Sequence, residues 1–365
     1  MIKFLDLNKI NQPYENAFQN KLRSVLDSGW YILGEEVKLF ERNFANYCQS
    51  KYCIGVGNGF DALTLIYKGY IQLGKMQKGD EVIVPANTYI ATILSIIQAD
   101  LVPVLVEPKL ETYNINPNFI ADKITNKTRS ILAVNLYGQL AELNAINDIA
   151  NKNNLIVVED SAQSHGAISN NIKSKNTQAF SFYPGKNLGA LGDGGAVVTN
   201  DDELAEVLFS IRNYGSQVKY YNDFIGVNSR LDELQAAFLN VKLPNLDNEN
   251  QIRKNIAKRY LLEINNENIT LPFWDFSDNH VFHLFVIRTP KRFELQEYLK
   301  QNGIETLIHY PVAPHRQKAF QNWSNLQLPI TEKIHDEVLS LPISPVMTDD
   351  EVDYVIQKLN LWTYL

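Results

Sequence analysis

The chain has 365 residues, 45% of them hydrophobic, so it can bury a sizeable core in one large α/β unit or in a large domain with a smaller one. Its formal net charge of −7 provides no positive surface, so we expect no nucleic acid or anionic membrane as a partner. The six histidines and two cysteines show no metal-ligand spacing, so we expect no metal site and two buried, reduced thiols.

The apolar stretches of the chain do not resemble export or membrane segments. Charges at Lys3 and Asp6 interrupt the N-terminal segment, which therefore lacks the apolar region of a secretory signal. The longest apolar stretch, 89–106, is broken by Gln98 and Asp100. We therefore expect a cytoplasmic protein with no membrane partner.

The first motif with chemical meaning is a glycine turn within 52–61, between a strand and a helix predicted over 61–71. Free backbone N–H groups and the helix dipole at such a junction suit a phosphate. However, Gly55, Gly57 and Gly59 do not complete a dinucleotide-binding motif, and no Walker lysine follows. From this segment alone, an ordinary structural turn is the favoured explanation.

Strand-like and helix-like runs alternate through the middle of the chain. The pattern predicts a mainly parallel sheet covered by helices on both faces. The predicted strands are 81–84, 102–106, 131–134, 155–158, 179–183 and 196–199. Tyr89 follows the first of these at the start of a helix over 90–97; its ring could lie on a cofactor or be an ordinary core tyrosine.

Polar residues follow the next strands where those strands end. Asp160 comes after 155–158, at the sheet edge where open α/β sheets bind ligands, and a carboxylate there can pair with a pyridinium nitrogen. Lys186 lies on a turn, where its amine can face a pocket and form an imine. Singly, an Asp after a strand is usually a helix cap and a Lys in a glycine-rich loop is usually solvated. Together with Gln163 and Ser181, they predict a pyridoxal phosphate site.

A polar motif near 226–233 is only partly explained by local structure. Ser229 and Asp232 have the spacing of a capping box before an apolar run. Asn228 is not explained by that motif. A lone histidine such as His165 is more often a hydrogen-bonded structural group, with a supporting role behind the site as the alternative.

The pattern of predicted elements changes from about residue 248. We expect a charged helix over 250–264, an apolar strand over 281–287 and a helix over 293–302. These elements predict a large domain over 1–247 and a smaller C-terminal α+β domain over 248–365, packed against each other because no flexible linker separates them.

The stretch 181–195, SFYPGKNLGALGDGG, together with Asp160 and Gln163, resembles the sugar aminotransferases of the DegT/DnrJ/EryC1/StrS family. The resemblance covers nearly the whole chain. It implies fold type I, the aspartate aminotransferase fold, and pyridoxal 5′-phosphate bound covalently to Lys186. Within the family, the stretch is most similar to enzymes that aminate C3 of dTDP-3-keto-6-deoxyhexoses, since C4 enzymes more often have a His near the lysine.

The resemblance also implies roles for residues that local patterns leave open. Asp160 would contact the pyridinium nitrogen, and Asn228 would reach the phosphate across a subunit interface, so we expect a homodimer with shared sites. The other cofactor contacts it implies are Gly59, Phe60, Asp61, Tyr89, Gln163 and Ser181. The substrate contacts it implies are Trp30, Tyr31, Tyr183, Lys219, His309 and Tyr310. Asn135 stands where many relatives have a His.

The implied reaction takes an amino group from glutamate, through a pyridoxamine 5′-phosphate form, to the keto sugar. The product would be dTDP-3-amino-3,6-dideoxy-galactose or -glucose, used for lipopolysaccharide O-antigen or an S-layer glycan. Three alternatives stay open. A sugar dehydratase would have a His in place of Lys186, and Tyr183 and Asn187 argue against a C4 aminotransferase. A noncatalytic nucleotide-binding regulator would use only the glycine turn.

Overall fold

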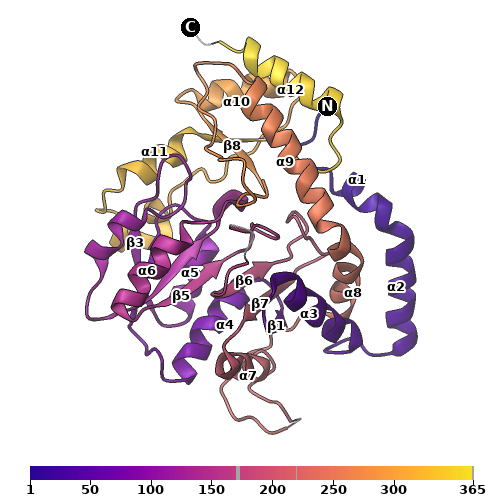
Figure 1. Ribbon diagram of the computed structural model, residues 1–365, viewed down its shortest axis with the longest axis vertical. Coiled ribbons are helices and arrows are strands. Elements are labelled where there is room, and N and C mark those ends of the chain that lie inside the picture. The colour runs from indigo at the N-terminus through magenta and orange to yellow at the C-terminus, as the bar shows by residue number, and fades with distance from the viewer. Residues whose placement is uncertain (170–172, 219, 364–365) are drawn as a thin grey trace.

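The computed structural model describes residues 1–169, 173–218 and 220–363, and its centre is a seven-stranded sheet of order β1-β7-β6-β5-β4-β2-β3 (Figure 1). Only β7 runs antiparallel to its neighbours, which confirms the predicted mainly parallel sheet. The strands are β1 (Tyr52–Val56), β2 (Glu81–Pro85), β3 (Val102–Val106), β4 (Thr128–Val134), β5 (Ile156–Asp160), β6 (Thr177–Ser181) and β7 (Gly195–Thr199).

Helices cover both faces of the sheet because successive side chains of its strands point to opposite faces. Ile54 of β1 and Val197 of β7 join one core cluster, whereas Cys53 and Val198 beside them join another. On the first face lie α4 (Gly59–Gln72), α5 (Ile90–Gln98) and α7 (Asp202–Ile211); on the opposite face lie α3 (Glu35–Cys48), α6 (Leu143–Asn153) and α8 (Glu233–Lys242). Both cysteines are free and buried, as predicted.

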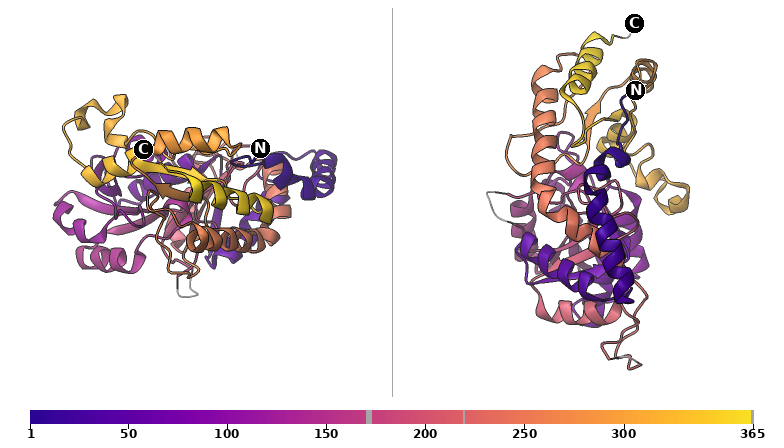
Figure 2. Two further views of the ribbon diagram at one scale, coloured as in Figure 1. Left: turned by 90° about the horizontal axis from the view of Figure 1, so that it is seen from above. Right: turned by 90° about the vertical axis from the view of Figure 1, so that its right-hand side faces the viewer.

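A smaller C-terminal unit stands above the sheet in Figure 1, and α9 (Leu246–Glu263) runs from one unit to the other, as the two views of Figure 2 also show. Its two strands pair antiparallel, and its core contains residues of α9, α10 and α12. The elements are β8 (Phe285–Arg288), α10 (Arg292–Gln301), α11 (Pro329–Glu337), β9 (Val338–Leu341) and α12 (Asp349–Leu361).

The first residues of the chain pack against this C-terminal unit. Ile2 belongs to its core, and the Ile2 amide donates to the Gly303 carbonyl at 2.7 Å. After this contact, α1 (Leu7–Asn11) and α2 (Glu15–Ser28) lead back to the sheet unit. The domain limits 1–247 and 248–365 stay a prediction. Short 3-10 turns complete the fold at Gln12–Tyr14, Pro117–Phe119, Ala121–Lys123, Leu136–Gly138, Leu243–Asn245, Pro314–Arg316 and Lys318–Trp323.

The strand predicted over 281–287 is shorter in the structure. Phe282 has a positive φ of 46°, and the amides of Val281 and Leu284 donate to the carbonyls of Gly138 and Tyr137. This segment therefore bonds to the large unit, and β8 begins only at Phe285. Within the described ranges, no helix has both the length and the apolar character needed to cross a membrane.

Candidate active site

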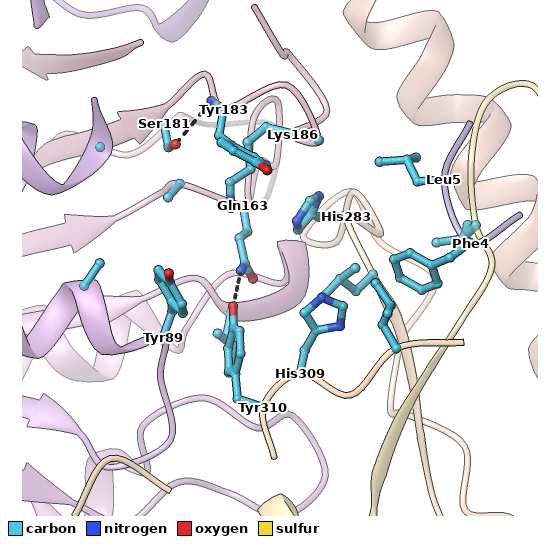
Figure 3. Close-up of a pocket in the computed structure, with 18 of the residues that line it drawn as sticks. Phe4, Leu5, Tyr89, Gln163, Ser181, Tyr183, Lys186, His283, His309 and Tyr310 are labelled. Atoms are coloured by element: carbon cyan, nitrogen blue, oxygen red, sulfur yellow. Dashed lines mark hydrogen bonds between the residues drawn. The ribbon is translucent and has the colours of Figure 1, made fainter. Parts of the chain in front are cut away.

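A cavity of about 1250 Å³ lies where the carboxyl ends of the central strands meet the C-terminal unit (Figure 3). Open α/β sheets bind their ligands at this edge. The cavity brings together ten of the residues predicted for the site, although they come from distant parts of the chain. They are Gly59, Phe60, Tyr89, Asp160, Gln163, Ser181, Tyr183, Lys186, His309 and Tyr310.

Asp160 ends β5 as a buried carboxylate with two fixed hydrogen bonds. Its Oδ2 accepts from Thr92 Oγ1 at 2.7 Å, and its Oδ1 accepts from the Ala162 amide at 3.2 Å. Since Thr92 gives its only hydroxyl proton to Asp160, its contact with Thr88 Oγ1 at 2.7 Å has Thr88 as the donor. Burial raises the pKa of Asp160, while the charge of Lys186 acts in the opposite direction.

Lys186 lies on the turn after β6 and lines the same cavity. Burial lowers the pKa of its amine to about 8, and the charge of Asp160 opposes this shift. An amine with such a pKa is partly neutral near physiological pH, so it can act as a nucleophile and accept protons.

Gln163 and Tyr310 form an oriented polar pair on the cavity wall. Gln163 Oε1 accepts from the Tyr137 amide at 2.6 Å, which fixes its Nε2 as the donor to the Tyr310 hydroxyl at 3.1 Å. The centroid of the Tyr89 ring lies 5.2 Å from that of the Tyr310 ring. Because Tyr89 is 52% exposed and lines the cavity, the face of its ring stays accessible there.

The N-terminus of α4 approaches the end of β6 closely, as a phosphate site requires. The amides of Gly59 and Phe60 have no acceptor in the part of the chain that the structure describes, whereas the Asp61 amide donates to Asn58 Oδ1 at 2.8 Å. A Cβ at Gly59 would lie 2.7 Å from Ser181 Cβ, so only glycine permits this approach. Gly59 and Phe60 thus keep the predicted free amides, and the Asp61 amide is already used.

The predicted capping box at Ser229 and Asp232 is wrong. Helix α8 begins only after Asp232, whose side chain makes no capping hydrogen bond. Ser229 Oγ instead accepts from the Gly57 amide at 3.0 Å and donates to Asp61 Oδ2 at 2.6 Å. A long-range contact that fixes the glycine turn therefore replaces the local motif.

Of the predicted site residues that the structure describes, four do not line this cavity: Trp30, Tyr31, Asp61 and Asn228. Trp30 and Tyr31 are 61% and 53% exposed beyond it, and Asn228 is also exposed. Lys219 lies outside the described residues.

The residues of the cavity fit pyridoxal phosphate. Asp160 is a buried carboxylate that can face a pyridinium nitrogen, and Lys186 is an amine with a lowered pKa. The free amides at the start of α4 provide an anion site beside the Ser181 hydroxyl. In the described part of the chain, His, Cys, Asp and Glu side chains form no group that could hold a metal ion.

Comparison with known proteins agrees with this arrangement. The model of the DegT/DnrJ/EryC1/StrS aminotransferase family matches residues 13–360. The chain belongs to this family.

Individual relatives match the aminotransferase over its whole length. A dTDP-3-amino-3,6-dideoxy-alpha-D-galactopyranose transaminase of Aneurinibacillus thermoaerophilus is 56% identical over 381 residues, covering 100% of both chains. The crystal structure of S. venezuelae DesV in complex with a ketimine intermediate aligns with a TM-score of 0.95 at 42% identity, over 99% of this chain and 98% of that chain. The Bacillus subtilis NtdA structure with bound cofactor PMP has a TM-score of 0.90 at 33% identity, over 98% of this chain and 83% of that chain. These matches confirm the predicted family, fold type, aminotransferase class and pyridoxal phosphate dependence.

Sequence reasoning missed several residues of this aminotransferase site. Thr92 lies 68 residues before Asp160, so no local pattern links them; only its position one turn after Tyr89 was a signal. Asn135 lines the cavity, and its side chain bonds to Glu159, Ser161 and the Ala141 amide. Phe4 and His283 reach the cavity from the N-terminal segment and the segment before β8.

His165 of the aminotransferase is a core residue behind the site. It is fully buried, and its ring centroid lies 5.3 Å from that of Phe180 and 5.8 Å from that of Phe182. Burial lowers the pKa of its imidazole to about 3, so the ring is neutral. His165 therefore packs against aromatic rings and does not line the cavity.

Proposed function

We propose that this protein transfers an amino group from glutamate to C3 of a dTDP-3-keto-6-deoxyhexose, giving dTDP-3-amino-3,6-dideoxy-galactose or -glucose. The observation that carries this proposal is the full-length 56% identity to a dTDP-3-amino-3,6-dideoxy-alpha-D-galactopyranose transaminase. Tyr183 and Asn187, which flank Lys186, favour C3 over C4 as the site of amination.

The chemistry divides between the cofactor and the residues of the chain. Bound pyridoxal phosphate supplies an electron-withdrawing ring that stabilises negative charge on a neighbouring carbon. Asp160 would hold the ring nitrogen of the bound cofactor in its protonated form, and Thr92 holds the Asp160 carboxylate in place. The Lys186 amine would take up and return the proton at the reacting carbon, first of the amino donor and then of the sugar.

The wall of the cavity suits a sugar with several hydroxyl groups. Tyr183 is 58% exposed at the cavity, and Tyr310 can donate its hydroxyl proton because it accepts from Gln163. Nδ1 of His309 contacts Ser340 Oγ at 2.8 Å, which holds its ring beside Tyr310. The cavity volume of about 1250 Å³ exceeds that of most small-ligand pockets, as a cofactor together with a nucleotide sugar requires.

We further propose a homodimer in which each subunit completes the site of the other. The segment before α8 carries Ile225, 91% exposed, together with Asn228, and it contacts the Trp30–Ile32 segment through the Ile32 and Asp232 backbones. Large exposed apolar side chains such as Ile225, Trp30 and Tyr31 suit an interface. Asn228, Trp30 and Tyr31 would then contact the partner's cofactor and nucleotide. Glutamate as donor and the O-antigen or S-layer destination stay predictions from the resemblance, and the cytoplasmic location stays a prediction from the sequence.

The proposed amino donor and the role of Lys186 can be tested in the first half-reaction. Glutamate added without sugar should convert the bound cofactor to its amine form and release one 2-oxoglutarate per site. Borohydride reduction of the resting enzyme should attach the cofactor to the peptide containing Lys186, and Lys186→Ala should show neither result. Full turnover in Lys186→Ala would contradict the proposal, and a preference for another amino donor would replace glutamate.

A further inference from the structure

Two side chains of the cavity carry complementary hydrogen-bonding groups that are both unused. In the described ranges, Lys186 Nζ donates to no acceptor, and Nε2 of His283 has no partner. Figure 3 shows the imidazole of His283 on the cavity wall between Lys186 and His309. A donor and an acceptor that line one cavity without partners are available to a ligand or to each other.

Neighbouring backbone carbonyls fix the tautomer of His283. Nδ2 of Asn187 donates to the Val281 carbonyl at 3.2 Å and to Asn250 Oδ1 at 2.8 Å, so Asn187 Oδ1 is left as the acceptor. Asn250 is oriented in turn, because its Nδ2 donates to the His165 carbonyl at 2.8 Å. The contact of 3.2 Å between His283 Nδ1 and Asn187 Oδ1 therefore has Nδ1–H as the donor.

With its proton on Nδ1, His283 presents an unprotonated Nε2 to the cavity. Burial holds its pKa well below the usual value, and the positive charges of Lys186 and Arg253 act in the same direction. The ring is therefore neutral at physiological pH, and Nε2 can only accept a hydrogen bond.

We propose that Nε2 of His283 accepts a hydrogen bond from the Lys186 amine when the cofactor in its pyridoxamine form occupies the cavity, and so directs the lone pair of the amine at the substrate carbon. This role rests on the proposed function, in which Lys186 moves a proton at that carbon. A neutral acceptor takes one N–H of the amine and leaves the lone pair available. It also holds the ammonium after proton uptake, without changing its own protonation state.

The other polar groups near Lys186 are less suited to this role. Asp160 already accepts hydrogen bonds on both oxygens, and His165 does not line the cavity. His309 contacts the hydroxyl of Ser340, which can donate or accept, so its tautomer is not fixed. Of these groups, only His283 has a structure-defined acceptor facing the cavity.

The proposal can be tested on the enzyme loaded with pyridoxamine phosphate, in which Lys186 is free. The pKa of Lys186 would be followed by 13C NMR of ε-labelled lysine, with its signal assigned by loss in Lys186→Arg. His283→Phe removes the acceptor and keeps a ring, so we expect the pKa of Lys186 to fall by about one unit. His283→Gln keeps an acceptor at a similar reach and should restore most of the wild-type pKa.

A kinetic measurement uses glutamate alone, so it does not depend on the identity of the sugar. We expect His283→Phe to slow the first half-reaction by about 10- to 100-fold while the apparent glutamate affinity changes less than about 3-fold, with partial rescue in His283→Gln. The control is His280→Gln, a buried histidine that stacks on Phe282 and does not line the cavity; its half-reaction should keep the wild-type rate.

Two results would overturn the role of His283. One is an unchanged Lys186 pKa with an unchanged half-reaction in His283→Phe. The other is equal impairment of the Phe and Gln variants, which would indicate packing of the ring and not hydrogen bonding. Failure of the sugar reaction alone, with both His283 effects present, would contradict the proposed function and leave the inference intact.

Discussion

Asp160 and Lys186 face one cavity. Burial raises the pKa of Asp160 and lowers the pKa of Lys186, so it favours the neutral form of each side chain. Their mutual attraction works against both shifts, which suits a site where a proton must move in either direction. Residue types and spacing along the chain predicted this pair together with Gln163 and Ser181, and the family resemblance implied the other predicted residues of the cavity. Thr92 was not predictable, because its contact with Asp160 depends on the packing of α5 against β5.

The hydroxyl of Thr92 is the first test at the residue scale. Thr92→Val keeps the side-chain shape but removes a donor to a buried carboxylate, a loss of about 1.5–3 kcal/mol, so we expect kcat to fall about 10- to 100-fold. Thr92→Ser keeps the hydroxyl and should stay within a few-fold of the wild type. Steady-state kinetics of the three enzymes provides the measurement, and a Val variant as active as the Ser variant would remove Thr92 from the site.

The lowered pKa of Lys186 predicts a cost in stability for the cofactor-free chain. Between pH 8 and the ordinary pKa of 10.5, the unfolded chain holds a proton on this amine that the folded chain has lost, so the free energy of unfolding rises with pH. The folded chain is free of the cost above pH 10.5, and it bears the full cost once the pH has fallen below about 8. Lys186→Met avoids this cost. It should raise the free energy of unfolding at pH 7 by about 1–3 kcal/mol, allowing for partial exposure, and the gain should vanish near pH 10.5. Thermal unfolding at both pH values tests this, and equal midpoints at pH 7 would contradict it.

At the scale of elements, the site depends on how closely α4 approaches β6. The existence of the seven strands of the large sheet followed from apolar runs, but two helix boundaries did not. Helix α4 begins at Gly59 because the Asn58 side chain caps it, and α8 begins after Asp232 because Ser229 is used elsewhere. The Asn58 cap is a local contact with the Asp61 amide, whereas the start of α8 depends on contacts of Ser229 across the fold, which no local pattern contains.

Gly59→Ala tests the close approach of these two elements. Its Cβ would meet Ser181 Cβ at 2.7 Å, so the start of α4 must move away and the phosphate site must widen. We expect affinity for pyridoxal phosphate to fall at least about 10-fold, measured by fluorescence titration of the cofactor-free enzyme. Gly69→Ala in the same helix would crowd the end of the Leu204 side chain and lie at ordinary contact distance from Leu208, far from the phosphate site, and should retain wild-type affinity. Equal affinities of the two variants would show that the close approach is not needed.

At the scale of the whole molecule, the cavity lies between the sheet unit and the C-terminal unit, and a mixed core joins them. Tyr113 and Tyr137 of the sheet unit pack with Leu284 and Val286, which fits the packed interface predicted from the missing linker. The position of Ile2 in the C-terminal core was not predictable, since the N-terminal sequence has no pattern that names its partner.

The proposed dimer makes a prediction at this scale. Ile225 is 91% exposed in one chain, so Ile225→Glu should cost little in the monomer and place charges in the interface. We expect sedimentation velocity to show a dimer for the wild type and a shift toward monomers for Ile225→Glu, with weaker cofactor retention. Leu262→Glu on α9, at a side chain 65% exposed, should stay dimeric. A fully active Ile225→Glu monomer would contradict the shared site.

Amination at C3 can be tested by offering the enzyme two substrates separately. Enzyme, pyridoxal phosphate and glutamate would be incubated with a dTDP-3-keto-6-deoxyhexose or with a dTDP-4-keto-6-deoxyhexose, and NMR would identify the carbon that carries the new amino group. We predict an amine at C3 from the first substrate and no product from the second. Amination at C4 would contradict the assignment of the substrate and leave the roles of Lys186 and Asp160 unchanged.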